Sequence, residues 1–180
     1  MILSYKDCIE RFGSHYKLDM FVAEGKIYKL EAGIYSTDKF PSDLEVIFKK
    51  YPHAVLTGES AFYVHGLTDV IPEKYWLATK SKAAPIKSDK INQVFVREDL
   101  LPLGAAEKSV DGVSIPVYDK ERMLIELLRS KNTMPYDLYK EIIGRYRKII
   151  NELEIWRIQE YAAIFPKSKM ISKALDEEVF

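Results

Sequence analysis

The chain has 180 residues, of which 47% are hydrophobic and 12% aromatic, a composition typical of globular domains rather than of a disordered or fibrous chain. Its 27 basic and 27 acidic residues give a net charge of zero, which excludes a chain coated in positive charge. Any contact with nucleic acid must therefore come from local basic patches. The single cysteine, Cys8, excludes an intramolecular disulfide and an all-cysteine zinc site, and fits a reducing compartment.

No stretch approaches the ~20 consecutive apolar residues of a membrane span, and the first residues lack the pattern of a secretion signal. We therefore expect a soluble cytoplasmic protein with no membrane partner. Near Phe40-Pro41, short elements punctuated by glycines give way to longer helical patterns. This change predicts two domains, 1–40 and 41–180.

Two short helices are predicted in the first domain. Apolar residues recur at helical spacing over 5–12 and stop at Gly13, a natural residue just past a helix end. Ser14 is a good N-cap for a second helix, whose apolar stripe ends at Gly25. The turn between the helices is therefore expected to be tight.

A β-hairpin is predicted directly after these helices. Residues 27–30 and 34–37 are β-prone runs, and the loop between them has the length and the glycine of a hairpin loop. Helix, tight turn, helix and hairpin follow one another in the order of a winged helix-turn-helix. We therefore expect the α+β class, beginning with a winged helix-turn-helix domain.

The second domain is predicted to be mixed, with a small sheet and a helical C-terminal half. Ser42 and Thr57 can cap two short helices, and three strand candidates lie within 75–117. From Asp119 onward the apolar spacing is helical, including one long stripe over 139–153.

Catalytic and metal-binding motifs are not found. The three histidines have no second His or Cys three or four residues away, and there is no nucleophile elbow, P-loop or dinucleotide-binding loop. Glu59, Ser60 and His65 lie in one short predicted helix, but spacings of five and six residues place them on different faces. We therefore expect no enzymatic activity, no cofactor and no metal site.

The run 118–122 is dense in charge. Asp119 as an N-cap and Glu121 in the first helical turn explain both acids. Arg122 can reach Glu126 one turn on, a pair worth about 0.2–0.5 kcal/mol on a helix surface. We interpret this run as structural rather than as an acid/base pair.

Basic residues in the first domain are placed where they could meet a phosphate backbone. Lys17 lies on the outer face of the second helix, and Lys26 and Lys29 lie at the hairpin. The domain holds six basic and six acidic residues, so its non-specific affinity for DNA is expected to be weak and salt-sensitive.

A second basic patch is predicted in the helical half. The segment 129–148 carries a local excess of four positive charges, and part of it projects from the face opposite the apolar stripe. It could grip phosphates or an acidic partner, or simply keep the helix surface solvated. The patch consists of Lys140, Arg145, Arg147 and Lys148.

Short motifs in a fixed order extend over nearly the whole chain. They are Gly25-Lys26-Ile27-Tyr28-Lys29-Leu30 with Gly33-Ile34-Tyr35, Thr57-Gly58-Glu59-Ser60-Ala61 with His65-Gly66-Leu67-Thr68, Val117-Tyr118-Asp119-Lys120-Glu121-Arg122 with Leu127-Leu128-Arg129, and the helices around Tyr146 and Tyr161-Ala162. In this order and spacing, the chain resembles the AbiEi family of antitoxins of type IV toxin–antitoxin systems, also described as abortive-infection transcriptional regulators.

This resemblance implies a DNA-binding antitoxin that represses its own two-gene operon, with inverted repeats of its promoter as the DNA partner. The functional counterpart would be a nucleotidyltransferase-like toxin of the AbiEii type, opposed without a stable complex. The second domain would carry the antitoxin activity, and its basic face could extend the positive surface.

The resemblance also implies that the helix over 14–24 is the recognition helix and that the hairpin is the wing. The N-terminal turn of this helix would lie where base edges are read, and the hairpin lysines would contact the phosphate backbone of the DNA. The residues expected to contact DNA are Ser14, His15, Tyr16, Lys17, Lys26 and Lys29.

Two alternatives remain open from the sequence. One is an interaction module that docks a protein or an RNA and retains only the antitoxin-type domain. The other is an enzyme whose site is assembled across the strands, which convergence of Glu59, His65 and Glu121 in one pocket would indicate.

Overall fold

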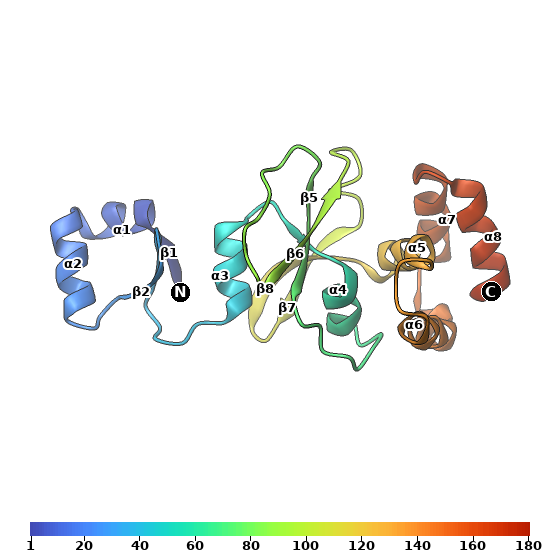
Figure 1. The fold of residues 1–180 in the computed structure, drawn as a ribbon, viewed down its shortest axis with the longest axis horizontal. Coiled ribbons are helices and arrows are strands. Elements are labelled where there is room, and N and C mark those ends of the chain that lie inside the picture. Colours follow the sequence, from blue (N-terminus) through green and yellow to red (C-terminus); the bar gives the residue numbers. More distant parts are fainter. The chain divides into compact units, whose positions relative to one another are not determined.

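The structure is a computed structural model that describes all 180 residues (Figure 1). The chain divides into two compact units: Met1–Ala54 with Lys108–Ile115, and Val55–Glu107 with Pro116–Phe180. It forms a three-stranded and a five-stranded sheet together with eight α-helices, which confirms the α+β class. None of these helices has the length and apolarity that crossing a membrane requires.

The N-terminal segment of the first unit, Met1–Ala54, is built from a small antiparallel sheet and three helices. Its elements are β1 (Ile2–Ser4), α1 (Tyr5–Phe12), α2 (His15–Ala23), β2 (Tyr28–Glu31), β3 (Ile34–Ser36) and α3 (Asp43–Lys50). The strand order is β1-β3-β2, with Ile2 opposite Ser36. Two helices followed by a hairpin were predicted and are present. Strand β1 was not predicted, because three residues are too few to show an alternating pattern.

Capping residues define the two first helices. The Ser4 hydroxyl accepts a hydrogen bond from the Asp7 N–H, and the Asp7 carboxylate accepts one from the Ser4 N–H, so a capping box begins α1. Gly13 ends α1 in the left-handed conformation at φ 85°. The Ser14 hydroxyl accepts from the Lys17 N–H and begins α2. Only two residues therefore separate the helices.

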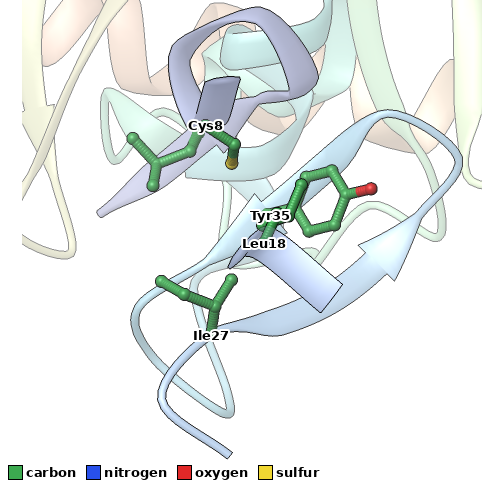
Figure 2. Packing of buried hydrophobic residues seen from close by; sticks show 5 residues of the cluster. Cys8, Leu18, Ile27 and Tyr35 are labelled. Carbon is green, nitrogen blue, oxygen red and sulfur yellow. The ribbon is translucent and has the colours of Figure 1, made fainter. Parts of the chain in front are cut away.

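A compact apolar core joins these helices to the sheet (Figure 2). Cys8 of α1, Leu18 of α2 and Tyr35 of β3 are buried together with Leu3 and Ile27. Burial raises the pKa of the Cys8 thiol, as expected for a thiol in an apolar core. Because Leu18 is completely buried, the rotation of α2 about its axis is fixed.

Helix α3 extends the first unit beyond the boundary expected at Phe40-Pro41. It packs on β1, and its Lys49 ammonium lies 2.7 Å from the Asp7 carboxylate. Its Lys50 ammonium lies 2.7 Å from the Glu31 carboxylate. These contacts explain why the compact unit includes residues up to Ala54.

The remaining elements form the larger sheet and a group of helices. They are β4 (Val55–Leu56), α4 (Gly58–Val64), β5 (Tyr75–Lys80), β6 (Ile91–Val96), β7 (Ala105–Val110), β8 (Val113–Tyr118), α5 (Lys120–Ser130), α6 (Tyr136–Ile149), the 3-10 turn η1 (Ile150–Glu152), α7 (Ile155–Ile164) and α8 (Ser168–Glu178). The strand order is β6-β5-β4-β8-β7, with β5 parallel to β6 and antiparallel to β4.

Helices α5, α7 and α8 pack on one another in the C-terminal half (Figure 1). The stripe predicted over 139–153 is divided, because α6 ends at Ile149 and η1 follows. Strands β4 and β7 were not predicted. The first has only two residues, and the second is mostly exposed and polar, which gives no buried strand pattern.

The capping carboxylate of α1 generates a prediction about acid stability. The Lys49 ammonium, followed by the Ser4 N–H, lowers the pKa of Asp7 from 3.8 to about 2. The ionised form is thus favoured by folding, so its stabilisation is complete above about pH 4 and is lost as the pH falls towards 2. We expect Asp7→Asn to lower the melting temperature at pH 6 but to show a smaller further loss between pH 5 and pH 2.5.

Thermal melts followed by circular dichroism would test this. Asp89→Asn, in an exposed loop, serves as the control and should leave the acid transition of the wild type unchanged. An Asp7→Asn variant with the same acid sensitivity as the wild type would contradict the assignment.

Candidate nucleic-acid interface

Helix α2 presents its first turn to solvent. Leu18 faces the core with no exposed surface, whereas His15, Tyr16 and Lys17 are exposed. The Tyr16 side chain is 78% exposed, which is unusual for a large aromatic residue that serves only packing. The exposed turn is therefore a candidate contact surface.

The four residues of this turn that are predicted to contact DNA differ in the contacts that their side chains already make within the protein. The Ser14 hydroxyl is used as the helix cap. His15 lies 3.3 Å from the Asp19 carboxylate and packs edge-on against the Tyr5 ring. Tyr16 and Lys17 make no side-chain hydrogen bond or ion pair, so they are the residues of this turn that can accept a new partner.

The hairpin supplies one further cation that has no ion-pair partner. Lys29 lies on β2, is exposed and makes no ion pair. Lys26 precedes the strand and is paired with Glu24 at 2.7 Å, with its ammonium over the Phe21 ring. Of the two predicted hairpin lysines, Lys29 is therefore the one whose charge is not compensated nearby.

The acids of this region are compensated locally. Each of the six acidic side chains in residues 1–40 lies within 4 Å of a basic group, which for Asp19 is the His15 imidazole, and α3 supplies two of these groups, Lys49 and Lys50. The formal neutrality of the region is thus distributed unevenly. Arg11, Lys17, Lys29 and Lys39 have no carboxylate partner, and Lys17 and Lys29 are those that lie on α2 and the hairpin, which favours contact with phosphates at these two points.

The second predicted patch is smaller than expected. Helix α6 buries its apolar stripe and leaves Lys140, Arg147 and Lys148 exposed. Arg145 is paired with Asp69, and the Arg147 Nε–H donates to the Glu178 backbone carbonyl at 2.6 Å. Lys140, whose ammonium lies over the Tyr136 ring, and Lys148 are the cations of this patch that make no hydrogen bond or ion pair.

Arg122 has a different role from the one predicted. Its side chain pairs with Glu126 at 2.8 Å, as expected, but it is fully buried rather than on a helix surface. Its guanidinium carbon lies 4.4 Å and 4.1 Å from the ring centroids of Tyr118 and Phe165. Two further hydrogen bonds go to the backbone carbonyls of Leu100 and Leu103. The prediction of a weak surface pair was wrong.

The neighbouring acids are also structural acceptors. The Asp119 carboxylate accepts from the Arg122 N–H at 2.7 Å and from the Tyr161 hydroxyl at 2.9 Å. Glu121 is buried and accepts from the Glu154 N–H. Burial raises the pKa of Asp119 despite these hydrogen bonds. The run 118–122 thus joins the end of β8 to the helices that follow.

Glu59, His65 and Glu121 do not converge. The His65 Nε2 atom lies 2.6 Å from the Tyr118 backbone carbonyl, at the end of α4. The cavity beside Glu59 is lined by neither His65 nor Glu121. No group of three or more His, Cys, Asp and Glu side chains is placed to hold a metal ion.

Comparisons with known proteins show a similar fold but no family. No protein-family model matches the chain, and none of the curated proteins matches it in sequence. Among solved structures, the RV2827C protein from Mycobacterium tuberculosis is similar with a TM-score of 0.67, over 99% of this chain and 72% of that chain. The two sequences are 14% identical, so this similarity shows the fold alone.

The buried guanidinium yields a prediction of stability. Arg122→Met removes the cation but keeps most of the side-chain volume, and it leaves two backbone carbonyls and one oxygen of Glu126 without their donors. We expect a loss of about 3–5 kcal/mol in the free energy of unfolding. Arg129→Met is the control, because Arg129 pairs with the other oxygen of Glu126 at the surface and should cost about 1 kcal/mol or less. Urea denaturation would measure both, and equal losses would refute the argument.

Proposed function

We propose that this protein binds double-stranded DNA through its first unit, which acts as a winged helix-turn-helix. Helices α1 and α2 with their two-residue turn would be the helix-turn-helix, and the β2–β3 hairpin would be the wing. The observation that carries the proposal is the exposed first turn of α2, where Tyr16 and Lys17 have no partner within the protein.

In this proposal α2 enters the major groove with its N-terminal turn against the base edges. Lys17 and Tyr16 would contact bases or the adjacent phosphates, and Lys29 would contact the backbone from the wing. The buried Leu18 supports this arrangement, because it prevents α2 from rotating its outward side chains away. His15 would need to exchange its contact with Asp19, and Lys26 its contact with Glu24.

The two lysines of α2 and the hairpin that have no carboxylate partner, Lys17 and Lys29, set the expected strength of binding. Neutralising two phosphates gives a slope of about −1.8 for the logarithm of the binding constant against the logarithm of salt concentration. Non-specific binding should therefore be weak, and specificity should depend on the contacts of α2 with bases. Inverted repeats in the protein's own promoter are the proposed target.

The biological role proposed is that of an antitoxin and autorepressor of a type IV toxin–antitoxin operon. It rests on the motif order that resembles the AbiEi family. The counterpart would be a nucleotidyltransferase-like toxin that forms no stable complex with this protein. Residues Lys140 and Lys148, which lack carboxylate partners, would extend the positive surface of the second unit.

Binding to the upstream DNA of its own gene, followed by fluorescence anisotropy across a salt series, tests the DNA proposal. We expect Lys17→Ala and Lys29→Ala each to weaken binding about fivefold and to reduce the salt slope by about 1. Lys6→Ala is the matched control, since Lys6 is exposed on α1 but paired with Glu10, and should leave binding within twofold. Equal binding by all variants would reject DNA recognition and favour a protein or RNA partner.

Coexpression with a neighbouring nucleotidyltransferase tests the antitoxin role separately. The Lys17→Ala/Lys29→Ala double variant should lose repression of a promoter reporter while still protecting growth from the toxin. Loss of both functions at unchanged protein levels would contradict a division of labour between the two units.

A further inference from the structure

A cavity in the second unit is not used by the proposed DNA contacts. It has a volume of about 190 Å³ and lies between α4, β5, β6 and the end of α5. Its apolar wall includes Phe62, Trp76, Met123 and Met134. A cavity of about 150 Å³ lined by apolar side chains is large enough to hold benzene, so this one can hold a single aromatic ring with a short substituent.

A glycine is required by the backbone at one position of the cavity wall, residue 58. Gly58 has φ 52°, and a Cβ atom there would lie 2.8 Å from the Trp76 indole. Any other residue would thus press against the wall of the cavity. The motif Thr57-Gly58-Glu59, which the predicted DNA contacts leave unexplained, therefore forms part of this wall.

The charges around the cavity have one sign. Two carboxylates line it, Glu59 and Glu126, and no lysine, arginine or histidine does. The Glu126 oxygens are occupied by Arg122 and Arg129, which reach it at 2.8 Å and 2.9 Å. Glu59 is half-buried and makes no ion pair or side-chain hydrogen bond. The cavity therefore contains one uncompensated negative charge beside aromatic rings.

We propose that this cavity binds a small organic cation, a protonated primary amine carried on an apolar body about the size of one aromatic ring. The ammonium group would pair with the Glu59 carboxylate and be attracted by the nearby aromatic rings. The apolar body would displace water from the cavity and pack against Trp76 and the two methionines. An anionic ligand is disfavoured because no cation faces the cavity.

Methionine-methyl NMR of the full chain with 2-phenylethylammonium is the direct test. The protein has five methionines, and the signals of Met123 and Met134 should shift in a saturable way. Met1, Met20 and Met170 do not line the cavity and should remain unchanged. The proposal would be overturned if no methionine signal shifted at amine concentrations up to about 20 mM. It would also be overturned if only the signals of Met1, Met20 and Met170 shifted.

The charge of Glu59 is tested with a pair of ligands and a pair of variants. Glu59→Gln should weaken binding of 2-phenylethylammonium about tenfold and leave the weaker binding of neutral 2-phenylethanol unchanged. Glu160→Gln, an exposed and unpaired carboxylate on α7, is the matched control and should change neither affinity. Equal affinity of the wild type for the amine and the alcohol would overturn the proposal.

This inference does not rest on DNA binding. All residues that line the cavity belong to the second unit, whereas Lys17 and Lys29 belong to the first. The amine should therefore bind the Lys17→Ala/Lys29→Ala variant with wild-type affinity, so failure of one proposal can be distinguished from failure of the other.

Discussion

The burial of one guanidinium group constrains the second unit more than any other single interaction. Moving a charge of this kind out of water costs several kcal/mol, so it must be fully satisfied. Arg122 meets this demand with the Glu126 carboxylate, two backbone carbonyls and two aromatic rings. These partners come from the end of β8, the loop before β7, α5 itself and the residue after α7. Satisfying the charge thus fixes how several elements meet.

The close packing around this group restricts its neighbours as well. Gly104 has φ 74°, and a Cβ atom there would lie 2.7 Å from the Arg122 Cβ atom. The same arginine occupies part of Glu126, whose second oxygen is bound by Arg129. Glu59 is the other carboxylate that lines the adjoining cavity, and it makes no ion pair. Arg122 thus stabilises the unit and also compensates one of the two carboxylates that line the cavity.

In the first unit, by contrast, the distribution of ion pairs matters more than the net charge. Helix α3 neutralises two acids of the α1 and β2 segments through Lys49 and Lys50. Without these contacts, Asp7 and Glu31 would add two uncompensated negative charges to the unit that is proposed to meet a phosphate backbone. An element outside the expected domain of residues 1–40 thus sets the electrostatics of the surface proposed to meet DNA.

The sequence by itself determined the local elements, because helix caps, glycines in left-handed conformation and apolar periodicity act over a few residues. The helices beginning at Ser14 and Asp119, the end of α1 at Gly13 and the hairpin after α2 were all predicted from such signals. Only the tertiary structure decided which side chains are buried and which form long-range contacts. Arg122 could be predicted to reach Glu126, but not to be buried, because its ring and carbonyl partners lie 4 to 43 residues away in sequence. The pairing of Asp7 with Lys49 and the cavity beside Glu59 likewise arise from long-range packing, which no short sequence pattern encodes.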